Sequence, residues 1–134
     1  MSKGFFFEII KITKPSTRGG IDVQYHSLNR NCNRNRIIDA AQAKKMMQEN
    51  PDAIILDVRT AREFSIGHVS GAVSLPEYAL AERAKMMIPN KDTLVLVYCR
   101  SGARSRMAMY DLLSMGFTNV YDFGGIVNWP YERT

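Results

Sequence analysis

The fold is decided by residues 93–105, which read TLVLVYCRSGARS. The first six residues are an apolar run of strand length, and Arg106 to Met115 has the spacing of a helix. Between them lies a short loop of small and basic residues, Cys99 to Ser105. Such a loop sits beside a helix N-terminus, where backbone N–H groups carry partial positive charge and stabilise an anion.

Cys99 is the candidate nucleophile of this loop. A thiolate beside a helix N-terminus and guanidinium groups has its pKa lowered into a reactive range. The alternative is that Cys99 is a small buried hydrophobe, which is the more common role of a lone cysteine after a strand. Two features favour the nucleophile. The following residues are too polar and basic to continue a core, and Gly102 permits the turn that aims several N–H groups inward.

The size and composition of the chain favour one globular domain. The 134 residues are too few for two domains of ordinary size, and the apolar and charged fractions, 46% and 23%, are typical of soluble proteins. No apolar stretch approaches the roughly 20 residues that span a bilayer, so we expect no membrane span. Two cysteines make no disulfide framework, and a free reactive thiol fits a reducing cytoplasm, which is the predicted location.

The net charge of +5 comes entirely from residues 1–36. This segment holds seven basic and two acidic residues, whereas the rest of the chain holds eleven of each. It could attract a nucleic acid or an acidic membrane surface, but a solvated, partly disordered extension is the simpler interpretation. We therefore predict a basic extension over residues 1–36, one domain over residues 37–134, no nucleic-acid partner and no role for Cys32.

Strand and helix patterns alternate along the predicted domain, which indicates a mostly parallel sheet with helices on both faces. A sheet of five strands is expected. The candidate strands are 53–58, 72–76, 93–98 and 119–122, with a possible strand at 5–12, and the candidate helices are 40–49, 60–66, 78–87, 106–115 and 126–129. Gly124-Gly125 is expected to form a turn. In such sheets the site lies at the carboxyl ends of the strands, where Cys99 is placed.

Three segments, in this order along the chain, resemble those of a single rhodanese domain. They are LDVRTAREF with GHVSGAV at 56–64 and 67–73, the loop from Cys99 to Ser105, and GGIVNW at 124–129. The resemblance covers residues 37–133 and implies the rhodanese-like α/β fold.

The resemblance also implies that Cys99 matches the active-site cysteine of the family. That cysteine takes a sulfane sulfur from a donor such as thiosulfate, becomes a persulfide, and hands the sulfur to cyanide, a thiol or a partner protein. No metal or organic cofactor is implied, and we expect a monomer. Thiolate attack on a sulfur–sulfur bond is exchange chemistry with sulfite as a good leaving group. A transfer through a covalent intermediate predicts ping-pong kinetics.

The candidate substrate-binding residues are the six that follow Cys99, namely Arg100, Ser101, Gly102, Ala103, Arg104 and Ser105. The two arginines are expected to hold an anionic donor, since guanidinium groups bind oxyanions through two parallel hydrogen bonds, although either could instead pair with an acid of the domain. The backbone N–H groups of 100–104 would stabilise the terminal sulfur of a persulfide. The serine hydroxyls could hydrogen-bond the sulfur, and Ser105 could equally cap the following helix.

Asp57, Arg59 and His68 are interpreted as structural residues. A carboxylate at a strand end usually accepts hydrogen bonds from nearby N–H groups or an arginine, which explains Asp57 and Arg59. A thiolate that is already ionised needs no general base, so no catalytic role is required of His68.

Two other classes of protein compete with a sulfurtransferase. Phosphatases of the cell-division-cycle type, and some arsenate reductases, resemble rhodaneses in fold. Their loop has seven residues, whereas Cys99 to Arg104 spans six, the form associated with sulfur transfer. Other rhodanese-like domains are non-catalytic docking or regulatory modules that lack the cysteine, but this chain keeps it with both flanking arginines.

Overall fold

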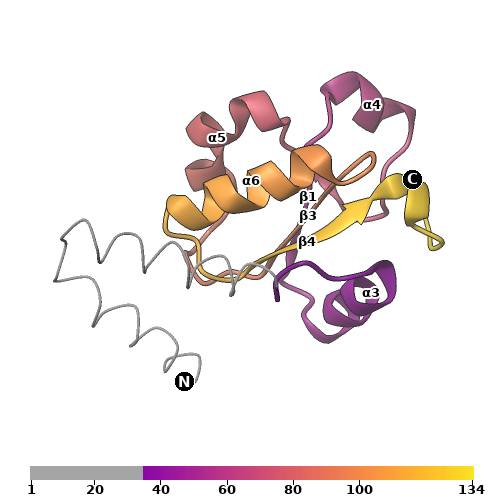
Figure 1. The fold of residues 1–134 in the computed structure, drawn as a ribbon, viewed down its shortest axis with the longest axis horizontal. Helices are drawn as coiled ribbons and strands as arrows, with labels where there is room; N and C mark the ends of the chain where they lie inside the picture. Colours follow the sequence, from indigo (N-terminus) through magenta and orange to yellow (C-terminus); the bar gives the residue numbers. More distant parts are fainter. Residues whose placement is uncertain (1–34) are drawn as a thin grey trace, which may run out of the picture. The chain divides into compact units, whose positions relative to one another are not determined.

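A sheet of four parallel strands runs through residues 35–134, the part of the chain that the computed structural model describes (Figure 1). The strands are β1 (Ile54–Asp57), β2 (Val73–Ser74), β3 (Val95–Cys99) and β4 (Val120–Gly125), in the order β2-β1-β3-β4. All three neighbouring pairs are parallel, which confirms the predicted α/β class. The expected strand at 5–12 and Cys32 lie outside the described residues.

The described residues form four strands instead of the five expected, and the fifth candidate, at 5–12, lies outside them. Ile37 forms a single parallel bridge to Asp122, supported by 2.9 Å hydrogen bonds from Ile38 N to the Asp122 carbonyl and from Asp122 N to the Arg36 carbonyl. The next residue, Asp39, already caps a helix. The pairing therefore ends after one bridge and no strand develops.

The helices follow the predicted pattern with small shifts. They are α3 (Ala40–Glu49), α4 (Ala61–Ile66), α5 (Leu80–Met87) and α6 (Ala103–Ser114), with short 3₁₀ turns η2 (Glu77–Ala79) and η3 (Ile126–Asn128). Helix α3 is capped by Asp39, whose carboxylate accepts the Gln42 N–H at 2.8 Å. Two boundaries differ from expectation. Helix α6 begins at Ala103 rather than Arg106, and Gly124-Gly125 belongs to β4 instead of forming a turn.

The helices cover both faces of the sheet, with α5 and α6 on one side and α3 on the other (Figure 1). Side chains alternate along β3 between two apolar clusters. Val95, Val97 and Cys99 pack with residues of α5 and α6, whereas Leu96 and Tyr98 pack with Ala43 of α3. Because β3 is buried on both faces, it reads as a continuous apolar run. The same alternation turns Cys99 toward α6.

A buried polar network holds the carboxyl ends of β1 and β3 together. The Asp57 carboxylate accepts hydrogen bonds from the Arg59 side chain, the shortest at 2.7 Å, and from the Tyr98 hydroxyl at 2.6 Å. The Tyr98 oxygen in turn accepts the Val69 N–H at 3.0 Å, and Arg59 donates to the Gly67 carbonyl at 2.6 Å. Burial and the hydrogen bond to Asp57 raise the pKa of Tyr98, so the hydroxyl keeps its proton. These contacts confirm the structural interpretation of Asp57 and Arg59.

None of the helices within residues 35–134 is both long enough and apolar enough to cross a membrane.

Replacing Tyr98→Phe should lower the free energy of unfolding by about 1–3 kcal/mol, because a buried acceptor and the Val69 N–H both lose a partner. Urea unfolding followed by circular dichroism measures the change. Tyr110→Phe is the matched control and should change the value by less than about 0.5 kcal/mol, since the Tyr110 hydroxyl makes no hydrogen bond among the described residues. Equal effects of the two substitutions would contradict the importance of the network.

Candidate active site

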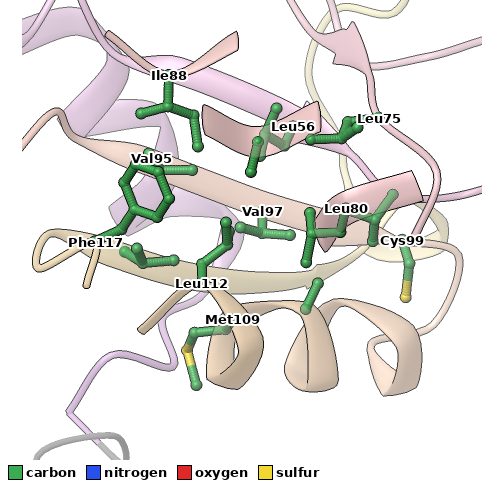
Figure 2. Close-up of a cluster of buried hydrophobic side chains, with 14 residues drawn as sticks. Leu56, Leu75, Leu80, Ile88, Val95, Val97, Cys99, Met109, Leu112 and Phe117 are labelled. Carbon is green, nitrogen blue, oxygen red and sulfur yellow. The ribbon is translucent and has the colours of Figure 1, made fainter. Parts of the chain in front are cut away.

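Cys99 is the last residue of β3 and lies at one end of the apolar cluster that faces α5 and α6 (Figure 2). Figure 2 shows its sulfur pointing out of the cluster, away from the side chains of Leu80 and Val97. The cysteine is free and only 1% exposed. The sulfur is therefore held beneath the loop that follows it rather than on the surface.

The loop after Cys99 folds back so that its N–H groups reach the sulfur. Gly102 donates its N–H to the Cys99 sulfur at 3.0 Å. It does so with φ at +113°, in the left-handed region that glycine adopts without strain, and it is the N-cap of α6. The sulfur thus lies at the N-terminus of a twelve-residue helix, where the helix dipole favours negative charge.

The pKa of Cys99 is lowered by this environment. Burial raises the pKa of the thiol, but the polar Ser105 hydroxyl and the backbone N–H groups of Ser105, Gly102 and Ser101 lower it, and the lowering prevails. The thiolate form is favoured because N–H donors stabilise the anion more than the neutral thiol. The sequence prediction of an ionised nucleophile receives support from this arrangement.

Ser105 is linked to a buried carboxylate that the sequence analysis did not single out. Its hydroxyl donates to Asp122 at 2.7 Å, with the Gly102 and Gly124 carbonyl oxygens at 3.2 and 3.3 Å. The same oxygen of Asp122 accepts the Gly124 N–H at 2.8 Å. Both side chains are fully buried. Asp122 therefore fixes the orientation of the Ser105 hydroxyl and joins the first turn of α6 to β4.

Strand β4 and η3 pack tightly against the loop. Val97 pairs with Asp122, but Cys99 pairs with Gly125. Strand β4 therefore has one more residue than β3 between these two pairs, which is a β-bulge. A Cβ atom added to Gly125 would overlap the Arg100 carbonyl oxygen, so this approach requires glycine. The Arg100 carbonyl also accepts the Val127 N–H at 3.3 Å. The backbone of the loop is thereby fixed from the β4 side.

Arg104 is paired with an acid, which was one of the two possibilities left open by the sequence. Its two terminal nitrogens donate to the two carboxylate oxygens of Glu63 on α4, at 2.8 and 3.1 Å. The guanidinium and the Thr60 N–H lower the pKa of Glu63 to about 2. Because this is below the ordinary value, the ion pair stabilises the fold at neutral pH and loses its effect as the pH falls from about 4.5 toward 2.

The other predicted site residues lie on the outside of the loop. Arg100, Ser101 and Ala103 are exposed. Their assignment to substrate binding stays a prediction, as does that of Arg104. No group of side chains suited to a metal ion occurs among residues 35–134.

His68 makes local contacts that fit a structural role. Its Nδ1 lies 2.9 Å from the Phe64 carbonyl oxygen, and its ring stacks on the Phe64 ring at a centroid distance of 3.7 Å. Its backbone pairs with Thr134 through hydrogen bonds of 3.0 and 2.7 Å.

Comparison with known proteins agrees with this fold. The family model of the rhodanese-like domain matches residues 39–131. A sulfurtransferase of Allochromatium vinosum is 32% identical over 93 residues, which cover 69% of this chain and 85% of that protein. The solved structure "rhodanese with anions from E. coli" superposes with a TM-score of 0.59 and 32% identity, over 61% of this chain and 96% of that chain.

The α/β fold and the cysteine loop define a rhodanese-type domain, and the chain belongs to the rhodanese-like domain family. Another relative is the tRNA uridine(34) hydroxylase of Photorhabdus laumondii, 34% identical over 94 residues. The match covers 66% of this chain but only 27% of that protein. The relatives of this chain thus include proteins with two different activities, a sulfurtransferase and a tRNA uridine hydroxylase.

Ser105→Ala should raise the pKa of Cys99, because a polar hydroxyl that favours the thiolate is lost, together with the hydrogen bond to Asp122 that holds the first turn of α6. The pH at which alkylation by iodoacetamide reaches half its maximal rate should move upward, and the rate at neutral pH should fall several-fold. Ser114→Ala is the matched control on α6, since its hydroxyl donates to the carbonyls of Tyr110 and Asp111 far along the helix. An unchanged profile in Ser105→Ala would contradict a role of this hydroxyl.

Proposed function

We propose that this domain is a sulfurtransferase that carries a sulfane sulfur as a persulfide on Cys99. The observation that supports it most directly is the 3.0 Å hydrogen bond from the Gly102 N–H to the Cys99 sulfur at the start of α6. A terminal persulfide sulfur is an anion, and inward N–H groups of the same loop stabilise it as they stabilise the thiolate. The sulfurtransferase among the relatives supports the same activity.

The transfer takes two steps that balance in atoms and charge. The Cys99 thiolate attacks the terminal sulfur of thiosulfate, the new bond forms between the two sulfurs, and the S–S bond of the donor breaks to release sulfite. Cyanide or a thiolate then attacks the outer sulfur of the persulfide. The bond to the Cys99 sulfur breaks, the thiolate is regenerated, and thiocyanate or a new persulfide leaves. A protein persulfide can replace thiosulfate in the first step.

The donor and acceptor meet the exposed part of the loop before they reach the sulfur. Arg100 is exposed on this loop and supplies a positive charge for an anionic donor. The solved rhodanese from Escherichia coli holds anions, which supports the same preference. A reducing cytoplasm suits the reaction, because it keeps the thiol free between transfers.

The six-residue loop disfavours phosphatase chemistry in this proposal. A seventh residue would widen the cradle for a tetrahedral phosphate, and here β4 closes on the loop at Gly125. We expect negligible hydrolysis of aryl phosphates.

A second candidate is the modification of uridine in tRNA. The 34% identity to the Photorhabdus laumondii tRNA uridine(34) hydroxylase favours it. This candidate replaces the expectation of no nucleic-acid partner, with the net charge of +5 in residues 1–36 attracting the tRNA. The test is the content of hydroxylated uridine at position 34 of tRNA in cells whose only copy of this chain is wild type or Cys99→Ser. Equal contents would contradict this candidate.

Intact-protein mass spectrometry tests the sulfurtransferase proposal. Treatment with thiosulfate or with a persulfide donor should add one sulfur atom to the protein, and cyanide should remove it. Cys99→Ala should gain nothing, whereas Cys32→Ser, the control at the other cysteine, should gain the sulfur like the wild type. The proposal fails if the wild type gains no sulfur from either donor, or if Cys99→Ala still gains it.

A further inference from the structure

The positive charge of Arg104 is largely offset by Glu63. The carboxylate meets the guanidinium through both oxygens, at 2.8 and 3.1 Å, with the two side chains 34% and 29% exposed. This is the two-bond geometry in which a guanidinium holds two oxygens of a sulfonate or phosphate. The carboxylate thus occupies the position in which Arg104 would otherwise bind the oxyanion of a donor.

Glu63 is also held from its own helix, so a donor does not displace it freely. Its Oε1 atom accepts the Thr60 N–H at 2.9 Å and the Thr60 hydroxyl at 3.2 Å, in addition to the bond from Arg104. The Thr60 hydroxyl in turn accepts the Glu63 N–H at 3.1 Å, which completes a capping box. The carboxylate is therefore a fixed negative charge beside the loop.

The other charges near the loop leave little net attraction for a dianion. Glu77 is exposed at the start of η2, and its negative charge raises the pKa of Arg104, as the charge of Glu63 does. Within residues 35–134, Arg100 makes no ion pair and is the loop arginine whose charge stays uncompensated. The Cys99 thiolate adds a further negative charge. A donor with two charges is repelled by the carboxylates twice as strongly as a donor with one.

We infer that Glu63 determines which sulfur donors this site accepts, selecting against doubly charged thiosulfate and in favour of singly charged donors such as organic persulfides and thiosulfonates. This inference rests on the proposed sulfurtransferase function. It assigns to Glu63 a role in specificity rather than in the chemical step, since its carboxylate binds Arg104 and Thr60 and not the sulfur.

Thiosulfate and methanethiosulfonate are the matched pair of donors that tests the inference. Both present a terminal sulfane sulfur bonded to an oxidised sulfur, but thiosulfate carries two negative charges and methanethiosulfonate one. The Cys99 thiolate attacks the terminal sulfur of either donor, its S–S bond breaks, and sulfite or methanesulfinate leaves with the bonding electron pair. The kcat/KM value is measured for each donor with cyanide as the common acceptor. A change in the reactivity of the thiolate alters both values by the same factor, so it cancels in their ratio.

Glu63→Gln removes the charge while keeping the shape of the side chain. We expect the ratio of kcat/KM for thiosulfate to that for methanethiosulfonate to rise on the order of tenfold, because one repulsive charge close to the donor is lost. Glu63→Asp is the control that keeps the charge. Its ratio should stay within about twofold of the wild-type ratio, even if a disturbed loop lowers both rates.

Glu77→Gln gives an independent measurement that leaves the capping box of α4 intact. Glu77 is exposed, so its replacement should leave the fold intact. Glu77→Gln should raise the ratio of kcat/KM for thiosulfate to that for methanethiosulfonate by about two- to threefold. A ratio that stays constant or falls in Glu63→Gln overturns the inference. If that variant does not fold, a constant ratio in Glu77→Gln overturns it.

The outcome also separates this inference from the proposed function. If neither donor places sulfur on Cys99 of the wild type, the proposed function itself fails. If both donors do so and the ratio does not respond to the carboxylates, only the role of Glu63 in donor choice is lost.

Discussion

The hydrogen bond from the Gly102 N–H to the Cys99 sulfur constrains more of this structure than any other single contact. The sulfur has to lie at the end of a strand and on the face that a helix covers, which the alternation along β3 provides. The chain then has to turn within three residues so that α6 begins against the sulfur. Gly125 has to lack a side chain so that β4 can approach the carbonyl groups of that turn. Strand, loop, helix and neighbouring strand are thus specified together.

Two carboxylates from outside the loop hold its C-terminal end from opposite sides. Asp122 of β4 accepts the Ser105 hydroxyl and fixes the first turn of α6 from within the core. Glu63 of α4 pairs with Arg104 from the solvent side. The loop of small and basic residues therefore does not keep its shape alone, because acids from two other elements position it. The anion site is tuned by negative charges that surround it as well as by the positive charges within it.

Local patterns explain why much of the architecture could be predicted from the sequence. The helix patterns, the apolar run of β3 and the position of Cys99 depend on residues a few positions apart. The contacts of Arg104 with Glu63 and of Ser105 with Asp122 join residues 41 and 17 positions apart, and they depend on how the strands align. The single bridge from Ile37 to β4 is likewise beyond local patterns, and it stays single because the cap at Asp39 starts a helix just after it.

The contact between η3 and the loop makes the tryptophan next to η3 an intrinsic fluorescent probe of the loop. Trp129 is the single tryptophan of the chain, and its buried ring lies 5.2 Å from the ring of Phe123. Two residues before it, Val127 donates to the carbonyl of Arg100 in the loop. A displacement of the loop that breaks this hydrogen bond would free η3, which ends at Trp129, and would change the surroundings of the indole. Intrinsic fluorescence can therefore follow the loop in real time without a dye.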